Sequence, residues 1–256
     1  MAGLTALMLR RRRSGRTLGG VNWSDFDAAL FDLDGVITPT AVVHMHAWER
    51  MFNDFLAGYD DQSPYTDDDY FTYLDGKPRY DGVQSVLESR GIHLPYGDPS
   101  DDPSATTVCG LGNRKNDAFE KVLASEGVEV YPGSKLLVDQ LAARGLALAV
   151  VSSSRNARNV LEAAGMLDSF PVIVDGNVAD AEDLLGKPRP DTFLDAAAKL
   201  GVPKERAVVL EDAVSGVQAG RAGGFGLVIG VDRGAGREAL LENGADIVVE
   251  DLEELT

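Results

Sequence analysis

Two aspartates two residues apart, Asp32 and Asp34, close the first apolar run of the chain. Residues two apart on an extended strand point to the same side, so both carboxylates are predicted to lie at the carboxyl end of a strand. Ligands bind at that end of the strands in open α/β sheets. Two carboxylates so close repel each other, and the pair therefore favours a site where a cation or a shared proton offsets their charge. Taken alone, one aspartate that caps a helix and one that serves a turn explain the pair equally well.

Polar residues also end two later apolar runs and occupy one loop. Ser152 begins three consecutive serines that lead into a predicted helix, where hydroxyls and free backbone N–H groups form an anion pocket. Lys187 lies in a proline-containing loop just before another helix, and Glu211 and Asp212 end a later run. A serine that caps a helix is the simpler explanation of Ser152, and a solvated surface lysine is the simpler explanation of Lys187. If the runs are neighbouring strands, one edge of the sheet collects an anion pocket, a cation and four carboxylates.

The elements that must position these residues are short strands alternating with helices. Six runs of branched and aliphatic residues, each closed by a turn or an acidic cluster, suit strands buried on both faces of a parallel sheet. These runs are 28–32, 146–152, 172–175, 207–211, 226–231 and 246–249. Helical patterns lie between them at 133–144, 154–164 and 191–200, and each ends before a glycine. The alternation predicts a doubly wound α/β domain with a parallel sheet.

One region breaks this alternation and contains no convincing buried strand. Amphipathic segments at 44–56, 83–90 and 115–125 are separated there by acidic loops that carry proline and glycine. We therefore predict a small all-helical domain inserted after the first strand. The predicted division is a disordered basic tail over 1–22, an α/β core over 23–40 and 131–256, and a helical cap over 41–130.

Composition and charge exclude several classes of function. The 256 residues include 24 Lys and Arg against 41 Asp and Glu, a net charge of −17, which disfavours nucleic-acid and anionic-membrane partners. A single cysteine, Cys109, cannot form an internal disulfide and fits a reducing compartment. No apolar stretch approaches the ~18–20 residues that span a bilayer, and the arginines 10–13 follow the first apolar residues instead of preceding them. We expect a cytoplasmic monomer that binds a small molecule.

In this order, the four polar motifs resemble those of the haloacid dehalogenase superfamily of phosphotransferases, whose nucleophile is an aspartate. The resemblance covers the core from residue 28 to the C-terminus and implies a Rossmann-like α/β core. It implies that Asp32 takes up the phosphoryl group and that Asp34 is the general acid and base. Ser152 and Lys187 are then expected to hold the phosphoryl oxygens. Because dehalogenases and phosphonatases lack an aspartate at the position of Asp34, cleavage of carbon–halogen or carbon–phosphorus bonds is not expected.

The same resemblance implies a Mg²⁺ cofactor. Its ligands are expected to be Asp32, the backbone carbonyl of Asp34, Glu211 and Asp212. Hard oxygen ligands and the presence of only three histidines favour Mg²⁺ over zinc. A cation and Lys187 would also reduce the repulsion between an attacking carboxylate and a phosphate dianion.

The predicted helical insertion resembles the cap of the superfamily's β-phosphoglucomutase branch. The positions that this resemblance assigns to the substrate are Thr40, His44, Trp48, Arg79, Lys115, Ser154, Arg155 and Asn156. His44 and Trp48, four residues apart, equally suit core packing, and Arg79 equally suits a solvated loop. Two departures from the branch are visible. Pro39 stands where an acidic residue is usual, and the segment 98–107 is longer and more acidic than a minimal cap.

The resemblance implies Mg²⁺-dependent interconversion of β-D-glucose 1-phosphate and glucose 6-phosphate. The expected intermediates are an aspartyl phosphate and glucose 1,6-bisphosphate, which is also the primer. A sugar-phosphate phosphatase, in which water replaces the sugar as acceptor, is the main alternative. A non-catalytic sugar-phosphate-binding protein is a third, less favoured because a binding module needs no nucleophile with a partner acid.

Overall fold

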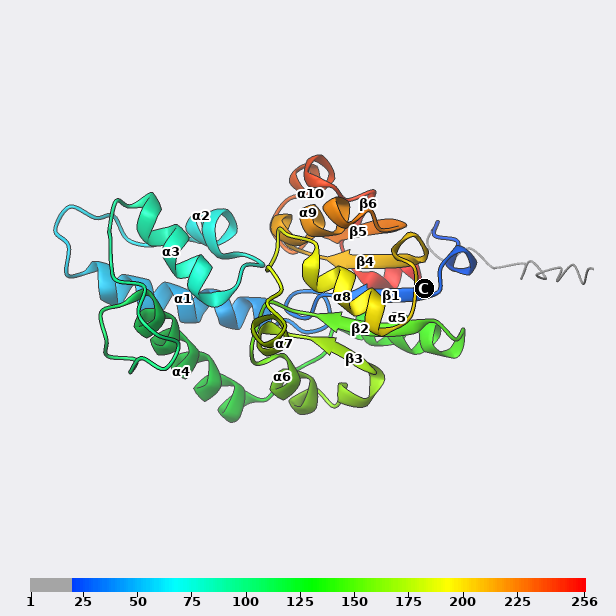
Figure 1. The fold of residues 1–256 in the computed structure, drawn as a ribbon, viewed down its shortest axis with the longest axis horizontal. Coiled ribbons are helices and arrows are strands. Elements are labelled where there is room, and N and C mark those ends of the chain that lie inside the picture. The colour runs from blue at the N-terminus through cyan, green and yellow to red at the C-terminus, as the bar shows by residue number, and fades with distance from the viewer. Residues whose placement is uncertain (1–19) are drawn as a thin grey trace, which may run out of the picture.

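The computed structural model describes residues 20–256 as two lobes, an α/β lobe and a helical lobe (Figure 1). The predicted basic tail lies outside the described residues up to residue 19. Val21 is only 5% exposed and packs in the core of the α/β lobe, two residues ahead of the predicted start of that domain. Within residues 20–256, no helix is long and apolar enough to cross a membrane.

The α/β lobe is built on a six-stranded sheet in which all neighbours are parallel, in the order β3-β2-β1-β4-β5-β6. The strands are β1 (Ala28–Phe31), β2 (Ala147–Val151), β3 (Val172–Val174), β4 (Ala207–Glu211), β5 (Leu227–Val231) and β6 (Ile247–Val249). All six predicted strands are present, and the fold class is confirmed. Because β1 lies between β2 and β4, the residues that follow these three strands converge at the middle of the sheet's carboxyl edge.

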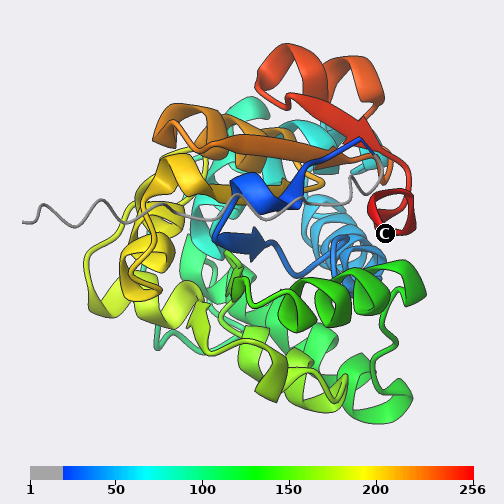
Figure 2. The same cartoon turned by 90° about the vertical axis from the view of Figure 1, so that its right-hand side faces the viewer.

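Helices cover both faces of the sheet. One face packs against α5 (Pro132–Ala143) and α6 (Ala157–Ala163), the other against α8 (Asp191–Lys199), α9 (Val214–Gly223) and α10 (Arg237–Asn243). A short helix, α7 (Gly176–Ala181), follows β3. The C-terminal turn η5 (Leu252–Leu255) packs beside α5 (Figure 2). The remaining 3-10 turns are η1 (Trp23–Asp25), η3 (Leu167–Ser169) and η4 (Lys204–Arg206).

The helical lobe has its own hydrophobic core and lies beyond the carboxyl ends of the strands (Figure 1). It contains α1 (Thr40–Leu56), α2 (Asp67–Asp69), the π-helical turn η2 (Tyr70–Leu74), α3 (Arg79–Ser89) and α4 (Val108–Glu126). As predicted, no strand lies between residues 41 and 130. Cys109 is buried in this core, whose other members include Phe52, Val86 and Leu111. The two lobes enclose a cavity between them, and its walls carry most of the predicted site residues.

Candidate active site

The first catalytic candidates are placed by the end of β1. Asp32 continues the ladder of that strand, since its backbone N–H donates to the carbonyl of Leu210 at 2.9 Å. Asp34 lies beyond the strand, in an isolated bridge with Thr38. Gly35 has φ +95°, and the chain turns there, directly after Asp34. Both aspartates lie at the carboxyl end of the strand and line the same cavity, as predicted, although the strand ends at Phe31 and the chain bends at Leu33 between them.

Asp32 shares a buried lysine with Glu211. The Lys187 ammonium donates to Asp32 Oδ1 at 2.5 Å, to Glu211 Oε1 at 2.5 Å and to the carbonyl of Val151 at 3.0 Å. Burial raises the pKa of Asp32 well above its usual value, although the charge of Lys187 opposes this. The pKa of Lys187 is also raised, because attraction to the two carboxylates outweighs its burial. A cation is thus held against the carboxylate that is predicted to be the nucleophile.

Asp212 follows Glu211 and lies near the same group. Its carboxylate packs over Gly35, where a Cβ atom would lie 1.9 Å from Asp212 Oδ2. Burial, followed by repulsion from Asp75 and Glu211, raises the pKa of Asp212 well above its usual value. Buried, mutually repelling carboxylate oxygens at one sheet edge match the hard donors that Mg²⁺ prefers, so the residues present fit this cation.

Glu211 is placed differently from Asp212. Its Oε1 accepts from Lys187 and its Oε2 accepts from the backbone N–H of Ala213 at 2.9 Å. Both oxygens therefore already have protein donors, and direct ligation of a metal by Glu211 stays a prediction. Within residues 20–256, no three His, Cys, Asp or Glu side chains converge closely enough to form a ready metal site.

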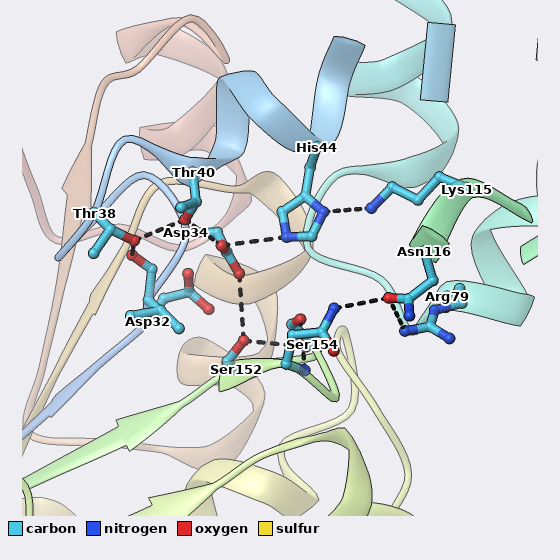
Figure 3. Close-up of polar contacts among 12 residues, drawn as sticks. Asp32, Asp34, Thr38, Thr40, His44, Arg79, Lys115, Asn116, Ser152 and Ser154 are labelled. Atoms are coloured by element: carbon cyan, nitrogen blue, oxygen red, sulfur yellow. Dashed lines mark hydrogen bonds and ion pairs between the residues drawn. The ribbon is translucent and has the colours of Figure 1, made fainter. Parts of the chain in front are cut away.

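Asp34 is surrounded by groups that stabilise its ionised form. Thr40 donates its hydroxyl to Asp34 Oδ1 at 2.5 Å, His44 Nε2 lies 3.3 Å from the same oxygen, and Ser152 Oγ lies 3.5 Å from Oδ2. Burial acts to raise the pKa of Asp34, but the charges and hydrogen bonds of His44, Thr40 and Lys115 together lower it below its usual value. Figure 3 shows His44 between Asp34 and Lys115.

Lys115 and His44 form a stacked group from two cap helices. The Lys115 ammonium contacts His44 Nδ1 and lies 4.7 Å from the ring centroid of Trp48. The imidazole of His44 stacks on Phe119 with centroids 4.0 Å apart. Burial, and to a lesser extent the charge of Arg79, lowers the pKa of Lys115 well below its usual value. Burial, followed by the charge of Lys115, lowers the pKa of His44.

A second polar group lies at the far end of the cavity from Asp32 (Figure 3). Asn116 Oδ1 accepts from Arg79 Nη2 at 2.6 Å and from Asn156 Nδ2 at 2.7 Å. Arg79 and Asn116 come from the cap and Asn156 from the core, so the group joins the two lobes. Burial lowers the pKa of Arg79. Its guanidinium presents a planar fork of donors that suits a phosphate.

The serine turn after β2 faces the cavity, whereas the arginine that follows does not. Ser152 Oγ accepts from the backbone N–H of Ser154 at 3.0 Å, and Ser154 Oγ accepts from that of Asn156 at 3.1 Å. These bonds form turns, and α6 therefore begins at Ala157, three residues later than predicted. Arg155 is not among the cavity-lining residues, because its guanidinium pairs with Asp180 and lies 5.4 Å from the ring centroid of Tyr80. Its predicted substrate contact stays a prediction.

The cavity contains about 650 Å³ of empty space, part of it open to solvent, and it is lined from both lobes. Sequence reasoning missed Asn116, although it directly follows Lys115, a residue that the cap resemblance assigns to the substrate. It also missed Asp75, whose carboxylate lines the cavity and whose pKa is raised to about 7, mainly by burial and then by the charge of Glu211. Ser153, between two predicted phosphate ligands, lines the cavity as well.

Comparison with known proteins identifies the family. A family model described as haloacid dehalogenase-like hydrolase matches residues 26–224. The chain belongs to this family. It falls in the β-phosphoglucomutase-like branch, because it is 49% identical over 238 residues to a β-phosphoglucomutase of Mycobacterium bovis, with 89% of this chain and 90% of that one covered.

More distant proteins resemble the chain in sequence or in fold. A β-phosphoglucomutase of Bacillus subtilis is 33% identical over 230 residues, which cover 90% of this chain and 91% of the relative. The crystal structure of a β-phosphoglucomutase from Clostridium difficile superposes with a TM-score of 0.73 at 24% identity, over 90% of this chain and 93% of that one. At that identity, the superposition shows a shared fold that includes both lobes.

Proposed function

We propose that this enzyme interconverts β-D-glucose 1-phosphate and glucose 6-phosphate through an aspartyl phosphate on Asp32 and a glucose 1,6-bisphosphate intermediate. One observation carries the proposal: a cationic side chain lies near each end of the cavity, Lys187 against Asp32 at one and Arg79, joined through Asn116 to Asn156, at the other. A bisphosphorylated sugar needs donors for both phosphates, whereas a phosphatase needs them only where the chemistry occurs. The 49% identity to a β-phosphoglucomutase supports the same activity.

The first half-reaction starts from the phosphorylated enzyme. The C6 oxygen of β-D-glucose 1-phosphate attacks phosphorus, the bond between phosphorus and the Asp32 oxygen breaks, and Asp34 accepts the hydroxyl proton. Thr40 and His44, which contact Asp34, orient its carboxylate for this transfer. General base catalysis of this kind contributes typically ~10²–10⁴-fold. The products are glucose 1,6-bisphosphate and the free carboxylate of Asp32.

The second half-reaction uses the same residues in reverse. After the bisphosphate has turned over in the cavity, Asp32 attacks the phosphate at C1 and the protonated Asp34 returns its proton to the leaving O1. Glucose 6-phosphate departs and Asp32 is again phosphorylated. Ser152 and Lys187 stabilise the charge on the transferring group, while Arg79 and Asn156 hold the other phosphate.

We propose Mg²⁺ as the cofactor, held by Asp32, Asp212 and the backbone carbonyl of Asp34. When bound, it supplies positive charge that offsets repulsion between the carboxylate of Asp32 and the phosphate. Glu211 is better placed to orient Lys187, with which it shares a 2.5 Å hydrogen bond, than to add a further ligand. Lys187 itself holds the nucleophile in place.

The helical cap, which we assign to residues 41–130, contributes sugar recognition and the exclusion of water. Lys115 and His44 face the space between the two phosphate-binding groups, beside the indole of Trp48. A cap closed over the sheet edge leaves the sugar, and not water, next to the aspartyl phosphate.

The test is a product assay. The protein is incubated with β-D-glucose 1-phosphate, Mg²⁺ and a trace of glucose 1,6-bisphosphate, and glucose 6-phosphate and inorganic phosphate are both measured. We expect glucose 6-phosphate in large excess, and no comparable turnover of the α anomer. Release of inorganic phosphate without glucose 6-phosphate would refute the mutase activity in favour of a phosphatase.

A further inference from the structure

Two serines of the α/β lobe hold one loop of the cap through consecutive backbone carbonyls. Ser153 donates its hydroxyl to the carbonyl of Gly76 at 2.7 Å, and Ser215 donates to the carbonyl of Asp75 at 2.9 Å. The serines come from different segments, one from the turn after β2 and the other from the second residue of α9. Each serine lies close in sequence to a predicted active-site residue: Ser153 directly follows Ser152, and Ser215 lies three residues after Asp212.

The loop fits closely against the core where these bonds form. Gly76 has φ +70°, and a Cβ there would lie 2.3 Å from Ser215 Oγ and 2.9 Å from Ala213 Cβ. The next contact is equally tight, because a Cβ at Gly186 would lie 2.3 Å from Cγ of Pro78. The backbone of residues 75–79 therefore contacts the core at successive points. A small displacement of this loop would break the hydrogen bonds that the two serine hydroxyls donate to it.

The loop carries two side chains that matter for the cavity. Asp75, at its start, lines the cavity, and Arg79, at its end, reaches Asn116 in the distal polar group. An error in the backbone position of this loop therefore displaces a wall of the cavity and the distal guanidinium together. Neither serine hydroxyl is needed for the chemistry at Asp32, since both are already donated to carbonyls.

We propose that Ser153 and Ser215 are positioning residues that hold the loop over the core and so determine whether the sugar or water receives the phosphoryl group. The inference rests on the proposed function. An aspartyl phosphate has two acceptors: attack by the sugar hydroxyl yields the bisphosphate, and attack by water yields inorganic phosphate, each with release of the Asp32 carboxylate. Loss of the hydroxyls lets the loop lift and admits water.

The experiment measures the ratio of inorganic phosphate to glucose 6-phosphate formed from β-D-glucose 1-phosphate by the full chain with Mg²⁺ and primer. Ser153→Ala and Ser215→Ala are each expected to raise the ratio about fivefold, and the double variant roughly 25-fold, the size expected for neutral hydrogen bonds lost beside a buried carbonyl. The burst of p-nitrophenol released from p-nitrophenyl phosphate in a single turnover, which reports phosphorylation of Asp32 and not its hydrolysis, is expected to stay within about twofold of wild type.

Two further variants separate this role from a general loosening. Ser89→Ala removes a cap hydroxyl that bonds only within its own helix, to the carbonyl of Val86 at 2.8 Å, and should leave the ratio unchanged. Gly76→Ala forces a Cβ against Ser215 and should raise the ratio while both serines are retained.

The outcomes distinguish this inference from the proposed function. If wild type forms glucose 6-phosphate and the double serine variant keeps the wild-type ratio, the inference is overturned and the mutase activity stands. An equal rise in Ser89→Ala also overturns it, because the effect would then be unspecific. Wild-type protein that releases only inorganic phosphate overturns the proposed function, and this inference with it.

Discussion

Replacement of Arg79 by alanine tests whether the distal end of the cavity binds a phosphate. Arg79 is held by Asn116 at 2.6 Å, in a group that Asn156 joins from the core at 2.7 Å. A hydrogen bond to a charged group contributes about 1.5–3 kcal/mol, and a bidentate guanidinium makes two. We therefore expect Arg79→Ala to lower kcat/KM for β-D-glucose 1-phosphate by roughly 10²–10⁴-fold, since each ~1.4 kcal/mol is a factor of ten.

The comparison substrate makes the result specific. p-Nitrophenyl phosphate has one phosphate and no group that reaches Arg79, so its hydrolysis should fall by no more than about threefold. Arg79→Lys keeps the charge but not the planar fork, and we expect it to recover part of the isomerisation rate. Equal losses of activity for both substrates would mean that Arg79 only supports the fold of the cap. That result would refute the proposal that a phosphate binds at each end of the cavity.

Three further predictions concern the sheet edge. Asp32→Asn should abolish turnover. It should also abolish the mass increase of one phosphoryl group that intact-protein mass spectrometry detects after incubation with glucose 1,6-bisphosphate. A mass increase that is retained in this variant would mean that another residue is the nucleophile. Asp212→Asn should raise the Mg²⁺ concentration needed for half-maximal activity by about tenfold or more, and an unchanged requirement would remove Asp212 from the cation site. Because the pKa of Asp75 is raised to about 7, the folded state binds more protons than the unfolded chain between the usual carboxyl pKa and that value. The metal-free protein should therefore lose stability as the pH rises through this window, by up to about 4 kcal/mol, and urea unfolding of Asp75→Asn should show a smaller loss.

The core of the site was predictable because its residues follow strands. Buried parallel strands read as continuous apolar runs, and their carboxyl ends must meet at one edge, so Asp32, Ser152 and Asp212 could be brought together before any coordinates. The path between Asp32 and Asp34 could not. It contains a bend at Leu33, which a pattern of alternating side chains does not reveal.

The cap was less accessible to sequence reasoning. Its helices follow an amphipathic period, yet the contacts that matter are made across lobes by short polar side chains with no periodic signal. Asn116 accepts from both Arg79 and Asn156, which are 37 and 40 residues away along the chain. Only the folded arrangement shows that an asparagine, rather than a charge, is the centre of the distal group.

Pro39 illustrates how one departure from the family pattern is compensated locally. Pro39 is the N-cap residue of α1 and makes no side-chain capping hydrogen bond, so the acidic residue usual at this position has no equivalent here. The start of the helix is fastened instead by a hydroxyl chain, in which Thr38 Oγ1 and Thr40 Oγ1 lie 2.7 Å apart and Thr40 donates to Asp34 at 2.5 Å. Because α1 also carries His44, the helix that opens the cap is tied at both contacts to the residue we assign as acid and base. A displacement of α1 would therefore also displace the two groups that contact Asp34.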